Sequence, residues 1–160
     1  MNQKIVNDQL IKNSLTEAKI IAMVGVSSVK NESASNIVRK PSIIVMRYLQ
    51  EFGYKVIPVN PFSAGEEVHG EIIVSKLSDI KIPIDIVDVF RPSKEAPEIA
   101  EQAVKVGAKV LWLQYGIQND DAKKIVESEK IFYISNKCIK QEYQRLFLKI
   151  SPVFPVLKSS

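Results

Sequence analysis

The ten residues 19–28 read KIIAMVGVSS and constrain the fold more than any other stretch of the chain. A run of branched apolar residues ends at Gly25 and leads directly into small hydroxyl residues, the order expected of a central parallel strand that enters a phosphate-binding turn. We therefore expect Gly25, Val26, Ser27 and Ser28 to face a ligand. An ordinary strand–helix corner is the alternative, because a single glycine turn is a weak signal.

The rest of the chain alternates between short apolar runs and helical patterns. Four further strands are predicted at 55–60, 84–90, 108–113 and 131–134, with a minor extended piece at 72–74. Helices are predicted after a cap at Asn7 or Asp8, and at 41–52, 92–106, 119–129 and 139–150; Gly107 is expected to close the third of these and Asn119 to cap the fourth. This order predicts an α/β class: one Rossmann-like domain over residues 1–160, with a doubly wound, mainly parallel five-stranded sheet and helices on both faces. The segment 27–40 is predicted to be a long loop, and the tail from about 151 to be irregular.

Ligands of such sheets bind beyond the carboxyl ends of the strands, which predicts where the site lies. Pro58 has no amide hydrogen for a strand ladder, so we place it near the carboxyl end of its strand, where the chain turns toward a ligand. The rule gathers four short segments on one edge of the sheet: 25–28, 58–61, 90–93 and 114–117.

The residues after the first strand restrict the kind of ligand. A dinucleotide fingerprint, GxGxxG with an acidic residue after the second strand, is absent: the second strand ends in Asn60-Pro61. A P-loop is also absent. What remains is an anion site made by the Ser27-Ser28 turn, the Lys40 side chain and the amino end of the helix that begins near Pro41, which suits a pyrophosphate.

Composition excludes several classes of protein. The 22 Lys and Arg against 18 Asp and Glu give a net charge of +4, too small and too dispersed for nucleic acid but favourable to a small anionic ligand. The longest apolar stretch, 20–26, is too short to span a bilayer, so no membrane association is expected. The single cysteine, Cys138, excludes a disulfide framework and a multi-cysteine zinc site, and no metal site is expected. A cytoplasmic protein is predicted.

Several motifs together carry a resemblance to a known family. They are, in chain order, VGVSS, RKPSIIVMRYL, FGYKVIPVNP, GEEVHGE, DIVDVFR, GAKVLWLQYGI and KCIKQEY. In this order they resemble the stand-alone CoA-binding protein family, which is similar to the amino-terminal domain of the succinyl-CoA synthetase alpha subunit. The resemblance spans roughly residues 8–147.

The resemblance implies a set of site residues around coenzyme A or an acyl-CoA. Those expected at the pyrophosphate are Gly25, Ser27, Ser28, Lys40 and Ser42. Asn60 and Pro61 are expected near the adenosine, Phe90 and Arg91 at the border of the nucleotide, and Gln114, Tyr115 and Gly116 along the far side of the cleft. The loop 29–39 is longer than the family's usual loop, which leaves the phosphate contact open among Lys30, Arg39 and Lys40.

Some of these residues have a structural alternative. Phe90 can be a core aromatic, and Trp112 is expected to be one. Arg91 can form a surface ion pair in place of a phosphate contact. His69 is expected to be merely exposed, and Asp85 and Asp88, three residues apart on a strand, are expected to point to opposite faces and not to act as a pair.

The resemblance also bears on activity. The related synthetases and ligases use a phosphorylated histidine and a partner ATP-grasp module, and the sole histidine here, His69, lies in a polar turn. We therefore expect a non-enzyme that binds CoA; the alternatives are a CoA-binding subunit of a separate ATP-grasp ligase and an NAD(P)-dependent oxidoreductase. Cys138 is expected to be a buried packing residue or, with Lys137 and Lys140 favouring its thiolate, to form a mixed disulfide with CoA.

Overall fold

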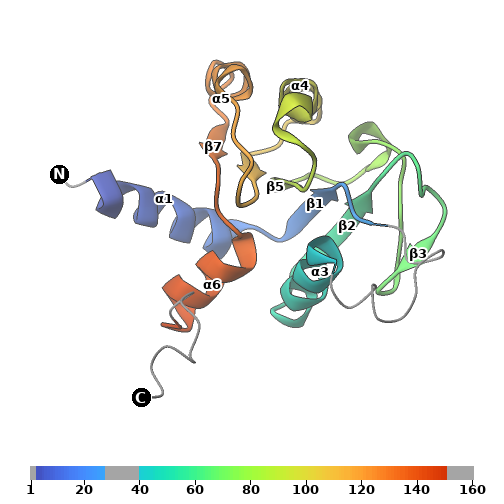
Figure 1. Ribbon diagram of the computed structural model, residues 1–160, viewed down its shortest axis with the longest axis horizontal. Helices are drawn as coiled ribbons and strands as arrows, with labels where there is room; N and C mark the ends of the chain where they lie inside the picture. Colours follow the sequence, from blue (N-terminus) through green and yellow to red (C-terminus); the bar gives the residue numbers. More distant parts are fainter. Residues whose placement is uncertain (1–2, 28–39, 151–160) are drawn as a thin grey trace.

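The protein is a three-layered α/β domain built on a parallel sheet, seen here in a computed structural model that describes residues 3–27 and 40–150 (Figure 1). The sheet strands are β1 (Ile20–Val24), β2 (Lys55–Val59), β5 (Ile86–Val89), β6 (Val110–Leu113) and β7 (Phe132–Ile134). The helices are α1 (Gln3–Glu17), α3 (Pro41–Glu51), α4 (Ala96–Val106), α5 (Asp120–Glu127) and α6 (Ile139–Phe147). The predicted Rossmann-like fold is confirmed. The predicted loop and tail lie largely or wholly outside the described residues.

The five strands lie in the order β2-β1-β5-β6-β7, and every neighbouring pair is parallel. The chain winds outward in one direction from β1 to β2 and in the other from β1 through β5 to β7. The point where this order reverses lies between β1 and β5, and open parallel sheets bind their ligands just outside such a point. The stretch 19–28 therefore occupies the centre of the sheet, as its sequence predicts.

Helices cover both faces of this sheet (Figure 1). One face carries α1, α3 and α6, which bury Met23, Ile86 and Trp112 from three adjacent strands. The other face carries α4 and α5 over Ala22, Val87 and Leu111. Because both faces are covered, the central strands are apolar on both sides, as expected of a parallel sheet. Trp112 is fully buried and donates its indole N–H to the Lys137 carbonyl at 2.8 Å, which confirms it as a core residue.

The predicted start of the first helix is wrong: α1 begins at Gln3, so Asn7 and Asp8 lie inside it and do not cap it. Asp8 instead accepts two hydrogen bonds, of 3.0 and 2.8 Å, from the Arg145 guanidinium on α6. Arg145 also pairs with Glu142, and these charge-assisted bonds raise the pKa of Arg145. Asp8 therefore lies within α1 and pairs with α6, where the sequence predicts a cap at the start of the helix.

The predicted helix 92–106 is split in two. A short 3₁₀ turn, η2 (Ser93–Glu95), precedes α4, which begins at Ala96. Pro97 explains the boundary, because a proline lacks an amide hydrogen and fits only the first turn of a helix. The predicted cap at Asn119 is confirmed: its side-chain oxygen accepts the Ala122 N–H at 2.9 Å. The last helix ends at Phe147, three residues earlier than predicted.

A small antiparallel hairpin, β3 (Glu67–Val68) and β4 (Glu71–Ile72), follows β2, and only its second half lies near the predicted minor strand 72–74. After the hairpin the chain returns to the sheet edge, where Val74 forms a parallel bridge with Val59. The 3₁₀ turn η1 (Leu77–Asp79) comes next. This bridge places residues 75 and 76 beside the carboxyl end of β2.

Candidate functional site

The carboxyl ends of the parallel strands share one edge, and the residues that follow β1, β2, β5 and β6 meet there. Gly25 N–H bonds the Val59 carbonyl at 2.8 Å, and Phe90 N–H bonds the Val24 carbonyl at 2.8 Å. Gln114 N–H bonds the Val89 carbonyl at 3.2 Å, which extends the edge to β6. The structure thus brings together the four strand-end segments that the sequence placed on one edge.

Gly25 makes the turn at the end of β1 with φ = +97°, a conformation that residues with a Cβ atom rarely adopt. The space above it is also tight, because a Cβ built on Gly25 would lie 2.8 Å from Arg91 Cδ and 3.2 Å from the Phe90 carbonyl carbon. The Phe90 backbone, just after β5, and the Arg91 side chain therefore approach this turn as closely as a glycine permits. Both the backbone conformation and the contact require glycine here.

The residues that follow Gly25 lie beside the amino end of α3. Ser27 N–H donates to the Ser42 hydroxyl at 3.1 Å, and Ser42 itself is buried. Lys40 is the residue that precedes the helix, and Pro41 occupies its first turn. Ser27, Lys40 and Ser42 thus lie together at a helix amino terminus, where the helix dipole and free amide groups favour an anion. Ser28, Lys30 and Arg39 lie outside the described residues.

Asn60 ties the end of β2 to the glycine turn. Its side-chain amide donates to the Val26 carbonyl at 2.8 Å, and its side-chain oxygen accepts the Phe62 N–H at 2.9 Å. Val26 is buried beneath this contact. Pro58 lies within β2, paired with Met23; it is tolerated because β2 is an edge strand. Pro61 and Phe62 are exposed beyond it.

A cavity of about 270 Å³ opens between the ends of β1 and β2 and the first turns of α4. Gly25, Asn60 and Arg91 line it, as expected of a site at this edge. It also has lining residues that the sequence analysis did not select: Phe62, Lys76, Glu95, Glu98 and Gln102. Glu95 was discoverable, since it lies four residues after Arg91, the spacing at which side chains on a helix meet.

Arg91 and Glu95 form a two-pronged ion pair at this cavity. Arg91 Nε donates to Glu95 Oε1 at 3.0 Å and a second guanidinium nitrogen donates to Oε2 at 2.9 Å. The hydrogen bonds with Arg91 lower the pKa of Glu95, so the pair is ionised around neutral pH. Arg91 therefore forms the ion pair that the sequence analysis gave as the alternative to a phosphate contact. The methylene groups of the Arg91 side chain also cover Gly25.

The far end of the edge joins β6 to the start of α6. The Gln114 side-chain oxygen accepts the Ile139 N–H at 3.1 Å, and Gly116 N–H donates to Asn136 Oδ1 at 2.7 Å. Cys138 immediately precedes α6, is half-buried and packs against the core beneath that helix. Tyr115 projects outward with 77% of its surface exposed. Gln114, Tyr115, Gly116 and Cys138 thus form one local group.

Asp85, just before β5, and Asp88, within β5, lie in very different surroundings. Burial raises the pKa of Asp85, but hydrogen bonds from the Ile20 and Lys19 N–H groups and from Lys109 outweigh it, so the pKa is lowered. Asp88 is fully buried in β5, and among the described residues neither carboxylate oxygen has a hydrogen-bond partner. Burial alone raises the pKa of Asp88 well above its usual range. The two carboxyl groups have separate surroundings and do not form an acid–base pair.

Outside the carboxyl edge, the described residues form a larger cavity and include the exposed His69. A larger cavity, about 620 Å³, lies at the opposite, amino-terminal edge around the Lys109–Asp85 ion pair, where parallel sheets do not bind ligands. His69 is exposed and near α3, with one ring nitrogen 3.2 Å from the Ile43 carbonyl oxygen. Within residues 3–27 and 40–150, no three His, Cys, Asp or Glu side chains gather as metal ligands, and no helix is long and apolar enough to cross a bilayer.

A doubly wound sheet with a glycine turn and a helix amino terminus at its switch point defines a protein of the nucleotide-binding α/β class. Residues 19–144 match the model of the CoA binding domain family, and the chain belongs to that family. The family expected from the sequence motifs is thereby confirmed, and membership of it supports CoA binding in general terms.

The chain is also similar to individual proteins in sequence or in fold. Protein YneT of Bacillus subtilis (strain 168) is 38% identical over 130 residues, which cover 81% of this chain and 89% of that protein. The structure of cell-free ID.343 from Thermus thermophilus matches with a TM-score of 0.79 and 35% identity, over 92% of this chain and 100% of that one. Acetyl-coenzyme A synthetase 1 (apo form) of Ca. Korarchaeum cryptofilum shares the fold at 23% identity and a TM-score of 0.58, over 74% of this chain but 26% of that one.

Proposed function

We propose that the protein is a non-catalytic module that binds coenzyme A or an acyl-CoA in the cleft at the carboxyl edge of the sheet. The pyrophosphate lies at the Gly25 turn, where the backbone conformation and the start of α3 favour an anion. The observation that carries the proposal is the joint position of Gly25, Ser27 and Ser42 at the switch point of a sheet from the CoA binding domain family. The adenosine lies toward Asn60 and Pro61.

The first test compares CoA with NAD. The residue after β2 that would bind both ribose hydroxyls of NAD is an acid in dinucleotide-binding folds, and here the Asn60 side chain is occupied by Val26 and Phe62. We expect CoA to bind at least tenfold more tightly than NAD in calorimetric titrations. Mass spectrometry of small molecules that copurify with the native protein should find a CoA species. Equal affinities for the two ligands would contradict the proposal and favour the oxidoreductase alternative.

A second candidate function is that of a CoA-binding subunit that acts with a separate ATP-grasp ligase. It is favoured by the fold match to acetyl-coenzyme A synthetase 1, in which a similar fold accounts for 26% of a longer chain. Copurification with an ATP-grasp protein, together with ATP-dependent thioester formation by the pair but by neither partner alone, distinguishes this candidate from a free-standing module.

The Cys138 thiol offers a further prediction about the pantetheine arm. The contacts between residues 114–116 and 136–139 place Cys138 on the carboxyl edge, beside the end of β6, which lies two strands from β1 in the sheet. If the arm follows this edge, the Cys138 thiolate attacks the disulfide of oxidised CoA, forming a mixed disulfide and releasing one CoA thiolate. Intact-mass measurement should then find one CoA adduct, reversed by reductant and absent from Cys138→Ser. CoA binding without an adduct would leave Cys138 as a packing residue.

A further inference from the structure

The outer wall of the cleft is formed by Phe62 and Lys76, which come from two segments held side by side by backbone contacts. Asn60 N–H bonds the Val74 carbonyl at 2.9 Å, and Val74 N–H bonds the Pro58 carbonyl at 3.0 Å. These bonds bring the chain that leads to Lys76 alongside the turn that carries Phe62. Both side chains line the 270 Å³ cavity that begins at Gly25.

Phe62 is 86% exposed, the most exposed large apolar side chain among the described residues. Its backbone is held in place, because its own N–H bonds Asn60 Oδ1 and the next residue, Ser63, is buried. An exposed aromatic ring that lines a cavity offers a flat apolar face to a planar ligand, and base–aromatic stacking is a favourable contact for any nucleobase.

Lys76 supplies positive charge on the same wall. Arg91, the other cation in the cavity lining, is already matched by Glu95 through two hydrogen bonds. Lys76 is exposed, and no carboxylate of the described residues lies within ion-pairing distance of its ammonium group. The opposite wall, from α4, contributes Glu98 and Gln102, which suit an amino group better than a phosphate. Beyond the Gly25 turn, the Lys76 wall of the cavity therefore favours an anion and the α4 wall does not.

We infer that Phe62 and Lys76 recognise the 3′-phosphoadenosine end of CoA, with the Phe62 ring stacked on the adenine and the Lys76 ammonium paired with the 3′-phosphate. This inference rests on the proposed function, which puts the pyrophosphate at Gly25 and the adenosine beyond β2. It makes Lys76 the residue that distinguishes CoA from dephospho-CoA, which lacks only that phosphate. It also places the contact with the 3′-phosphate on a different segment from Lys30, Arg39 and Lys40, the cations that the sequence analysis considered for phosphate contacts.

The test is a set of calorimetric titrations with CoA and dephospho-CoA. A hydrogen-bonded charge pair changes affinity roughly tenfold, so the wild-type protein should bind CoA about tenfold more tightly than dephospho-CoA. In Lys76→Met the two affinities should become equal through a loss for CoA alone. Phe62→Ala should lower the affinity for both ligands by the same factor, so that the ratio of the two affinities stays unchanged.

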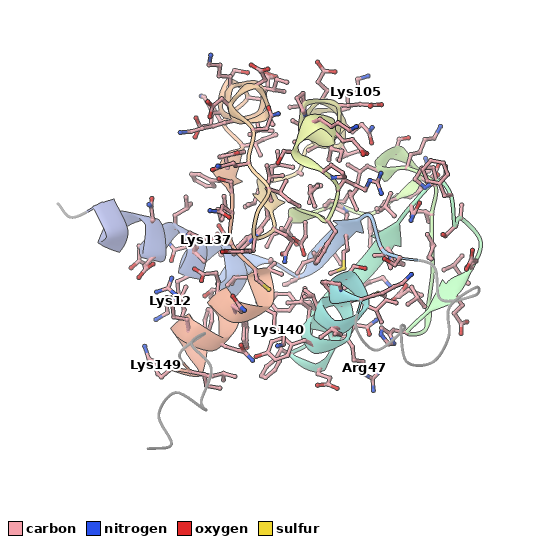
Figure 2. All side chains as sticks on the ribbon, in the orientation of Figure 1. Lys12, Arg47, Lys105, Lys137, Lys140 and Lys149 are labelled. Carbon is pink, nitrogen blue, oxygen red and sulfur yellow. The ribbon has the colours of Figure 1, made fainter. Side chains whose placement is uncertain are left out.

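Lys105→Met is the matched control, because Lys105 is exposed on α4, away from the sheet and outside the cavity lining (Figure 2). It should behave as the wild type. A preference for CoA that survives in Lys76→Met would overturn the inference, and its loss in Lys40→Met would assign the phosphate to α3 instead. Equal binding of both ligands by the wild type would also overturn the inference while leaving CoA binding intact. A wild type that binds neither ligand would overturn the proposed function itself.

Discussion

Replacing Gly25 with Asp should lower the affinity for CoA by at least a hundredfold. The change puts a carboxylate at the turn where the ligand's pyrophosphate has to approach the backbone, and like charges in close contact repel strongly. The added side chain also prevents the pyrophosphate from coming as close to the backbone as a glycine allows. Calorimetry with CoA measures the loss directly.

This substitution also strains the fold, because of the positive φ and because the new Cβ would press on Arg91 and on the Phe90 backbone. A residue with a Cβ in that conformation costs about 1–2 kcal/mol. Folding therefore has to be checked by circular dichroism and thermal melting. Gly53→Asp is the matched control: Gly53 has φ = +95°, nothing lies within 4 Å of its built Cβ, and it lies at the opposite end of β2. It should share the backbone strain and keep full affinity for CoA.

Ser27→Glu keeps the prediction testable if Gly25→Asp does not fold. Ser27 is half-buried, and its contact with Ser42 is made by its backbone N–H, which the substitution retains. The variant should fold and should also lose affinity for CoA. Wild-type affinity in both a folded Gly25→Asp protein and the Ser27→Glu protein would remove the pyrophosphate from this turn.

The sequence was most informative where a signal is local. The strand within 19–28, the cap at Asn119 and the helix end at Gly107 depend only on neighbouring residues, and the structure has each of them. The predicted start of α1 was wrong because Asp8 pairs with Arg145, 137 residues away. No local pattern in the sequence shows such a partner. The two-residue strand β3 was missed because a pair such as Glu67-Val68 carries no periodicity.

The same distinction applies to the candidate site. The strand-end segments could be predicted because the topology of a parallel sheet places them together. Lys76 could not, since its position depends on the bridge between Val59 and Val74 across the small hairpin. No local pattern predicts that the Asn60 and Gln114 side chains hold the backbone around the cleft, because both bond main-chain groups of other segments. Ligand contacts by Asn60 and Gln114 stay a prediction.

Replacing Asp88 with Val should raise the free energy of unfolding at pH 7 by about 1–3 kcal/mol, the usual penalty for a buried polar group without a partner. Asp88 lies in the centre of the sheet, paired in register with Met23 and Trp112, whose side chains belong to the core under α3 and α6. The Trp112 indole N–H is already bonded to Lys137. Valine has a similar volume, suits a strand and needs no hydrogen bond.

The pH dependence gives an independent test of the same carboxyl group. Because burial raises the pKa of Asp88 in the folded protein above its unfolded value, the folded state keeps a proton that the unfolded state has lost. The Asp88 contribution to stability is therefore complete below the unfolded pKa, about 3.9, and is lost as the pH rises toward the folded pKa. Asp88→Asn has nearly the same shape and no titration, so its stability relative to the wild type should increase from pH 5 to pH 8.

Urea unfolding of the wild type, Asp88→Val and Asp88→Asn at a series of pH values separates the two effects. Because the variants are compared with one another at each pH, the contributions to stability from carboxylates whose pKa is lowered, such as Asp85 and Glu95, cancel. The Val variant should be the most stable of the three at pH 8, since it has neither a buried charge nor an unsatisfied amide. A Val variant less stable than the wild type, with a difference that does not change with pH, would mean that the Asp88 carboxylate is ionised and held by a partner in solution.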